Sequence, residues 1–115
     1  MIIDTSVLID ILRGKLKPIG DAISIISVME VLRALDGEKR VKVFEELKNT
    51  YTIYPIDEKV ALEYAELYSE LKKKGRLVSD LDLLIASTAK AYNEKVLTKD
   101  KDFLNLKEYI EIITL

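Results

Sequence analysis

Four acidic residues stand at positions where an α/β protein builds metal or catalytic sites. Asp4 follows an apolar segment at the start of the chain, and Asp100 follows another near its end. Glu30 and Asp82 each come three residues after a serine, a spacing typical of the first turn of a helix. Carboxylates gathered in one pocket repel one another, so the set favours a bound divalent cation, and Mg²⁺ or Mn²⁺ prefers such oxygen ligands.

The composition limits the chemistry that these acids would support. The chain has no cysteine and no histidine, which excludes disulfides, thiol nucleophiles and the usual zinc ligands. Ser6 lacks a histidine to activate it, so a serine hydrolase is not expected. A metal-activated water that attacks phosphorus needs neither missing residue type. Phosphodiester hydrolysis therefore fits the composition.

Five neighbouring residues are candidates for supporting roles: Thr5, Ser6, Asp80, Thr98 and Asp102. The three hydroxyls are suited to orienting ligands or a bound water, although helix capping explains them at least as well. Helical spacing turns Asp80 about 200° away from Asp82, so we interpret Asp80 as an acid that interacts favourably with the helix dipole and as a candidate to support a metal ligand from behind. Asp102 is the alternative to Asp100 as fourth ligand.

Strands and helices are predicted to alternate along the chain. Apolar runs with β-branched residues predict strands over residues 1–3, 22–26, 51–54, 95–98 and 110–114. Helical periodicity and capping residues predict helices over residues 7–13, 27–35, 38–49, 57–74 and 80–92, and a helical turn after Asp100. We therefore expect an α/β fold: one domain over residues 1–115, a three-layer, Rossmann-like sandwich with a mostly parallel central sheet flanked by helices.

This topology brings the four acids to the same edge of the sheet. Sites in parallel α/β sheets lie beyond the carboxyl ends of the strands. Asp4 and Asp100 come just after strand ends, and Glu30 and Asp82 begin helices that start at that edge. Each acid taken alone is explained as a helix cap, but their convergence favours a site.

The bulk properties are those of a globular protein, which we expect in the cytoplasm without a membrane partner. Hydrophobic residues make up 49% of the chain, charged residues 33%, and no secretory signal is expected before Asp4. The net charge of -2 argues against a protein that coats nucleic acid through bulk charge. It permits a local basic rim, for which the candidates are Arg13, Lys15, Lys17, Arg33, Lys39 and Arg40.

Four segments together resemble the PIN domain family and, more narrowly, the VapC-type toxin ribonucleases of prokaryotic toxin-antitoxin pairs. They are residues 1–6, 27–30, 82–89 and 97–103. The resemblance implies a PIN-like fold, an endoribonuclease that needs Mg²⁺ or Mn²⁺, an RNA substrate, a homodimer, and an antitoxin whose tail can occupy the active site. It also implies that Asp4, Glu30, Asp82 and Asp100 bind the metal and are catalytic, with Thr5 or Ser6 as helper hydroxyls.

Two other functions compete with the nuclease interpretation. A non-catalytic PIN-like module that binds RNA or protein would have the same ligands without turnover. A phosphorylation receiver also gathers acids and Mg²⁺, but it needs an acceptor aspartate directly after a middle strand. Here the third predicted strand ends at Pro55, and Asp57 already caps the next helix.

Overall fold

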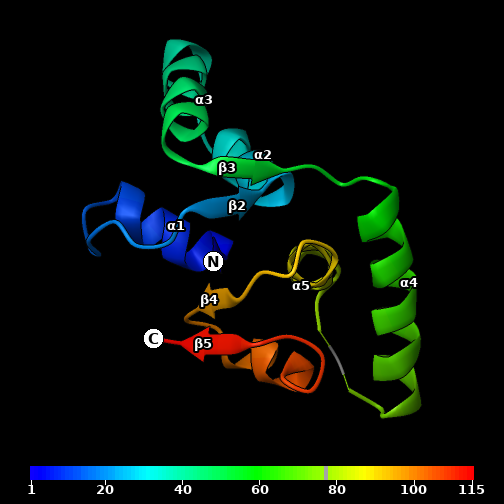
Figure 1. Ribbon diagram of the computed structural model, residues 1–115. Helices are drawn as coiled ribbons and strands as arrows, with labels where there is room; N and C mark the ends of the chain where they lie inside the picture. Colours follow the sequence, from blue (N-terminus) through cyan, green and yellow to red (C-terminus); the bar gives the residue numbers. More distant parts are fainter. Residues whose placement is uncertain (77) are drawn as a thin grey trace.

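A parallel sheet of five strands forms the centre of the molecule. The computed structural model describes residues 1–76 and 78–115. The strands are β1 (Ile2–Ile3), β2 (Ala22–Ser24), β3 (Thr52–Tyr54), β4 (Val96–Thr98) and β5 (Ile112–Thr114). They lie in the order β3-β2-β1-β4-β5, and each neighbouring pair is parallel. Figure 1 shows β3 beside β2 and β4 beside β5. The predicted parallel sheet is confirmed.

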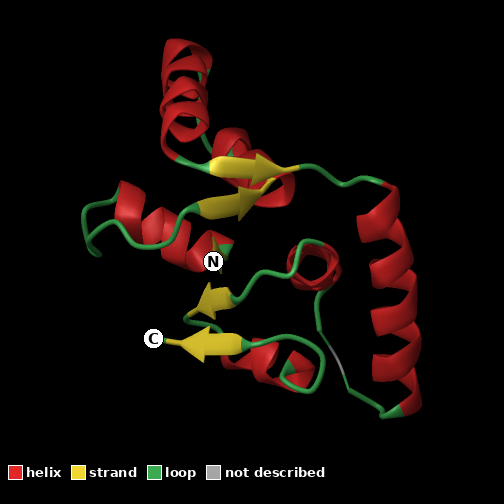
Figure 2. Cartoon of the chain, viewed as in Figure 1, coloured by secondary structure: helices red, strands yellow, loops and turns green. Residues whose placement is uncertain are grey.

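Helices cover both faces of this sheet (Figure 2). One face carries α1 (Thr5–Leu12), α2 (Ile25–Arg33) and α3 (Gly37–Thr50), and the other carries α4 (Glu58–Lys73), α5 (Asp80–Ala91) and the short 3₁₀ helix η1 (Lys101–Leu106). Adjacent strand residues point to opposite faces, so that Ile2 packs with α4 and α5 while Ile3 packs with α1. The expected three-layer sandwich is confirmed.

Helices α1 and α2 each begin two residues earlier than the sequence pattern predicts, at Thr5 and Ile25, and the shift of α2 moves a candidate site residue. Strand β2 ends at Ser24, whose hydroxyl accepts a hydrogen bond from the N–H of Ile26 at 3.0 Å and caps α2. Ser27, the predicted cap, therefore lies inside the first turn, and Glu30 lies in the second turn. The predicted start at Ser27 is wrong because β-branched residues such as Ile25 and Ile26 favour a strand only in general. Here the hydroxyl of Ser24 accepts a hydrogen bond from the N–H of Ile26, and this cap fixes the start of the helix.

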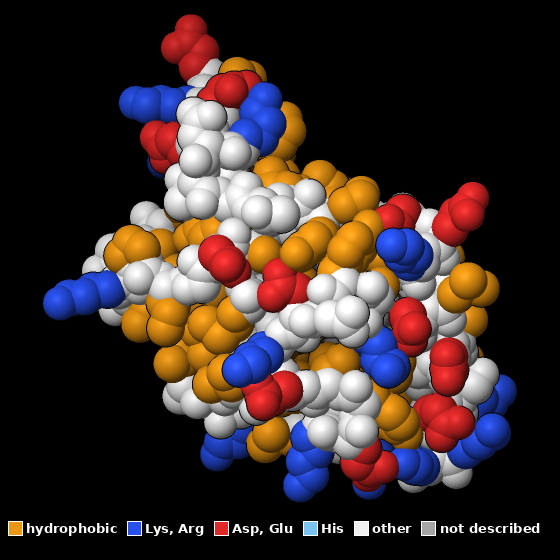
Figure 3. Space-filling view, viewed as in Figure 1, with side chains coloured by type: hydrophobic (Ala, Val, Ile, Leu, Met, Phe, Trp, Pro, Cys, Tyr) orange, Lys and Arg blue, Asp and Glu red, His pale blue; other side chains and the backbone are white. Residues whose placement is uncertain are grey.

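Helix α3 projects from the body of the protein (Figure 1). Leu47 is its one buried side chain in the part of the chain that the structure describes. Figure 3 shows acidic and basic side chains on α3 at the top of the view, and hydrophobic atoms at the surface around α1 below it. No helix in residues 1–76 or 78–115 is both long enough and apolar enough to cross a membrane.

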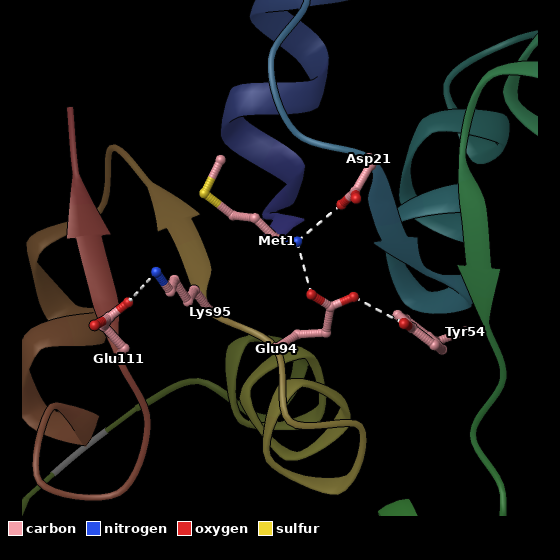
Figure 4. Close-up of polar contacts among 6 residues, drawn as sticks. All are labelled: Met1, Asp21, Tyr54, Glu94, Lys95 and Glu111. Atoms are coloured by element: carbon pink, nitrogen blue, oxygen red, sulfur yellow. Dashed lines mark hydrogen bonds and ion pairs between the residues drawn. The ribbon is translucent and has the colours of Figure 1, made fainter.

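Charges are paired at the amino ends of the strands. The amino group of Met1 contacts Oδ1 of Asp21 at 2.8 Å and Oε1 of Glu94 at 2.7 Å (Figure 4). Beside them, Lys95 forms an ion pair of 3.1 Å with Glu111. The acids at this edge therefore have cationic partners.

The strand order reverses between β1 and β4. The chain runs outward from β1 to β2 and β3, and then returns through α4 and α5 to β4 and β5. The register pairs Ile3 with Leu97, and the N–H of Asp4 donates to the carbonyl oxygen of Leu97 at 3.0 Å. Asp4 and Thr98 are thus neighbours at the carboxyl ends of the two central strands, the place where open α/β sheets bind ligands.

Candidate functional site

Asp4 is a buried carboxylate at this reversal of the strand order, and 3% of its surface is exposed. Its Oδ1 accepts hydrogen bonds from the N–H of Val7 at 3.0 Å and from the hydroxyl of Ser6 at 2.8 Å. Its Oδ2 accepts one from the hydroxyl of Thr98. A carboxylate offers about four lone-pair positions, so one position on Oδ2 is left for a further ligand. Asp4 caps α1, as predicted, and this role is compatible with ligand binding.

Glu30 is held from the neighbouring helix α1. Its Oε1 accepts a hydrogen bond from the hydroxyl of Thr5 at 2.7 Å, and the same hydroxyl lies 2.9 Å from that of Ser27. The guanidinium of Arg33, one turn further along α2, lies 3.8 Å from Oε2. Because Arg33 is largely exposed, it compensates the charge of Glu30 only weakly.

Asp82 is a half-buried acid whose charged form is disfavoured, first by burial and then by other carboxylates. Burial raises the pKa of its carboxyl group, and the charges of Asp100, Asp4 and Glu30 raise it further, against a lowering by the hydrogen bond with Ser79. Ser79 caps α5 by accepting from the N–H of Asp82 at 3.2 Å, as the Ser-x-x-Asp pattern predicts. The charges of carboxylates from three other segments therefore act on Asp82.

Asp100 is oriented by the turn between β4 and η1. Its N–H donates to the hydroxyl oxygen of Thr98 at 2.9 Å, and its Oδ1 accepts from the N–H of Asp102 at 2.9 Å. Asp102 is exposed in the first turn of η1, whereas Asp100 is among the acids that raise the pKa of Asp82. Asp100 is thus the better candidate for the fourth ligand.

Two of the candidate residues, one acidic and one basic, contact other parts of the molecule. Asp80 is exposed and accepts a hydrogen bond of 3.4 Å from the hydroxyl of Tyr64 on α4, in keeping with its predicted rotation away from Asp82. Arg40, a candidate for the basic rim, donates through Nε to the carbonyl oxygen of Leu35 at 2.8 Å. It closes the C-terminal end of α2 instead of facing the acids.

The donor set fits a hard divalent cation in type and charge. In residues 1–76 and 78–115, no three acidic side chains lie close enough to form a finished coordination shell. Within the same described parts, Asp4, Asp82 and Asp100 have no lysine or arginine nitrogen within 4 Å. A cation would offset both the burial and the negative charges that raise the pKa of Asp82, and Mg²⁺ or Mn²⁺ accepts a ligand set made only of oxygens.

Ser27 is a neighbour of the acids whose position the sequence pattern did not predict. It is fully buried and contacts Thr5, which in turn contacts Glu30. The presence of Ser24 was the available signal, because a cap at Ser24 leaves Ser27 free and places it one turn before Glu30 on the same helix face.

Comparisons with known proteins agree with the fold. The PIN domain pattern matches residues 1–109. The chain is 39% identical over 112 residues to Ribonuclease VapC1 of Methanocaldococcus jannaschii, covering 95% of this chain and 82% of that protein. It is 33% identical to Ribonuclease VapC of Rickettsia bellii, covering 99% and 95%. VapBC-5 of Mycobacterium tuberculosis, from the VapBC family of toxin-antitoxin systems, matches with a TM-score of 0.77 and 30% identity, covering 99% of this chain and 97% of that one. The chain therefore belongs to the PIN domain family.

Proposed function

We propose that this protein is a divalent-metal-dependent endoribonuclease and the toxin of a toxin-antitoxin pair. Two observations support the proposal: Asp4 and Asp100 follow the neighbouring parallel strands β1 and β4, and the charges of Asp4, Glu30 and Asp100 all act on Asp82. The names of the relatives support an RNA substrate, since both are ribonucleases. We expect the protein to act in the cytoplasm, where its substrate is found.

The four carboxylates are the groups that would hold Mg²⁺ or Mn²⁺. A bound divalent cation supplies Lewis acidity toward the phosphoryl oxygens and lowers the pKa of a water molecule, which makes hydrolysis possible without histidine. Asp4 would contribute through Oδ2, because Ser6 and Val7 already donate hydrogen bonds to its Oδ1. Thr98 and Thr5 orient Asp4 and Glu30 respectively through their hydroxyls.

An apolar groove next to Glu30 supports the antitoxin as partner. It has a volume of about 400 Å³ and lies between α1, α2 and α3. Its lining includes Leu12 and Val43 together with Glu30 itself, so a segment that fills the groove would cover one of the proposed metal ligands. We expect Leu12→Glu to weaken antitoxin binding at least tenfold while RNA cleavage persists. Ile19→Glu is the control, because Ile19 is exposed to 40% against 42% for Leu12 and does not line the groove. Equal affinities of the two variants would contradict this docking site.

We also propose a homodimer. Helix α4 carries exposed apolar side chains on its outer surface, with Leu62 exposed to 74% and Tyr68 to 49%. Burying such side chains against a second copy is favourable. Light scattering on the purified chain tests the mass, and a monomer at micromolar concentration would contradict the dimer.

The experiment that tests the proposed activity is RNA cleavage with and without cation. Purified protein is incubated with a synthetic RNA that contains a hairpin and single-stranded flanks, in Mg²⁺, in Mn²⁺ and in excess EDTA. We expect internal cleavage with either cation and none in EDTA. RNA binding without cleavage in all three conditions would instead favour a non-catalytic RNA-binding module.

A further inference from the structure

Buried serines on two helices use their hydroxyls in different ways. Ser87, fully buried on α5, donates to the carbonyl oxygen of Leu83 in its own helix at 2.6 Å. Ser27, fully buried on α2, contacts Thr5 on the neighbouring helix α1 at 2.9 Å. A serine in a helix can donate its hydroxyl proton to a carbonyl oxygen of its own helix, as Ser87 does. The hydroxyl of Ser27 instead contacts a side chain on another helix, so it links α2 to α1.

The direction of the hydrogen bonds follows from the number of available protons. A hydroxyl has one proton to donate, and an ionised carboxylate only accepts. Thr5 donates its proton to Oε1 of Glu30 at 2.7 Å. The proton between the two hydroxyls must therefore come from Ser27, with Thr5 as its acceptor. The result is a directed chain of hydrogen bonds from Ser27 through Thr5 to Glu30, which we call the hydroxyl chain.

The hydroxyl chain restricts the side chain of Thr5. A threonine has few χ1 rotamers, and each points its hydroxyl in a different direction. In the rotamer that the structure shows, the hydroxyl of Thr5 contacts both Ser27 and Glu30, so the hydrogen bond from Ser27 favours this rotamer. Ser27 is at the buried end of the chain, where water does not replace a missing donor.

We propose that Ser27 is a positioning residue for Glu30, acting by selecting the rotamer of Thr5 that holds the carboxylate at the metal site. This inference rests on the proposed function, because it takes Glu30 as a metal ligand. Partners that orient metal ligands typically contribute about 10- to 100-fold to metal affinity. Because Ser27 acts through one more hydrogen bond than Thr5, we expect its removal to give about a tenfold loss, at the low end of that range.

A double-mutant cycle on Mn²⁺ binding tests the hydroxyl chain. Isothermal titration calorimetry gives the Mn²⁺ affinity of the full chain as wild type, Ser27→Ala, Thr5→Val and the double variant. We expect Ser27→Ala to lose about tenfold in affinity in the wild-type background and nothing further in the Thr5→Val background, because Ser27 acts only through Thr5. Ser87→Ala is the matched control, since it removes an equally buried helical hydroxyl that contacts its own helix. Its Mn²⁺ affinity should equal that of wild type.

The possible results separate this inference from the proposed function. Unchanged affinity in Ser27→Ala, or additive losses in the cycle, would overturn the role of Ser27 while metal-dependent cleavage by the wild type still stood. Conversely, the four proteins of the cycle could show the expected Mn²⁺ affinities while the wild type cleaves no RNA. That result would contradict the nuclease assignment and leave the role of the hydroxyl chain intact. If Ser27→Ala does not fold, Thr5→Val decides, because Thr5 is partly exposed and valine has the same shape. Wild-type affinity in Thr5→Val overturns the inference.

Discussion

The hydroxyl of Thr98 donates a hydrogen bond to Oδ2 of Asp4, which joins the ends of β4 and β1 across 94 positions of the sequence. The same hydroxyl oxygen accepts from the N–H of Asp100 at 2.9 Å. One buried side chain therefore fixes two acids from distant segments relative to each other. Its position between two parallel strands depends on the register that pairs Ile3 with Leu97.

Replacing Thr98 with valine should destabilise the protein. The substitution keeps the shape of the side chain but leaves Oδ2 of Asp4 and the N–H of Asp100 without this partner. Leaving buried polar groups unsatisfied costs about 1–3 kcal/mol, which urea unfolding measures. Thr88→Val is the control, because the hydroxyl of Thr88 bonds to the carbonyl oxygen of Leu84 in its own helix. A loss in Thr98→Val no larger than in Thr88→Val would contradict the linking role of Thr98.

Without metal, Glu30→Gln should be more stable than wild type. Glu30 is one of the charges that raise the pKa of Asp82, so its neutralisation relieves repulsion. Because α2 is capped by Ser24, the substitution removes no helix cap. We expect a gain of up to about 1 kcal/mol in metal-free protein and a loss of Mn²⁺ binding. The melting temperature in EDTA measures the gain, with Glu66→Gln on the exposed surface of α4 as control. A lower melting temperature than wild type would contradict mutual repulsion.

The positions of Asp4, Asp82 and Asp100 in their helices and strands could be predicted from the sequence, because they depend on local patterns. Asp4 follows an apolar strand and precedes a helical period, and Asp82 follows the capping residue Ser79. Once strands and helices alternate, parallel topology brings such positions to one edge of the sheet. The prediction of the fold needed no long-range information beyond this rule.

The contacts that hold the acids could not be predicted in the same way. The link from Ser27 through Thr5 to Glu30 depends on where α2 starts, and Ser24 and Ser27 are both good capping residues. The link from Thr98 to Asp4 depends on strand register, which a pattern of short apolar runs leaves open. Side-chain rotamers follow from packing between segments that are distant in the sequence.

Tyr54 should ionise later than an ordinary tyrosine. Its hydrogen bond of 2.8 Å to Glu94, with burial and the negative charge of Glu94, raises the pKa of its hydroxyl to about 12 (Figure 4). The folded state therefore keeps a proton that the unfolded chain releases near pH 10. The stability from this group is complete below pH 10 and is lost as the pH rises from 10 to about 12.

Absorbance at 295 nm measures this ionisation directly. Tyr54→Phe keeps the ring that stacks on Tyr92 at 4.4 Å between centroids and removes the hydroxyl. The difference between the wild-type and variant titration curves should have its midpoint near pH 12. A midpoint near pH 10 would show that Glu94 does not hold the Tyr54 proton.

Asp4→Asn isolates the chemical role of Asp4 from its structural role. The amide oxygen of asparagine can replace Oδ1 as acceptor for Ser6 and Val7, and its NH₂ group can donate to Thr98 once that hydroxyl rotates. The fold should therefore survive, as circular dichroism and the melting temperature will report. The free lone-pair position on Oδ2 is lost, and with it a charge that a cation needs.

The most direct test of the acidic site is the rate of RNA cleavage by Asp4→Asn in Mn²⁺, measured beside wild type on the same RNA. We predict cleavage by wild type that requires the cation, and a loss of at least about 100-fold in the folded variant. Cleavage by folded Asp4→Asn at the wild-type rate would contradict the assignment of these carboxylates as the catalytic metal site.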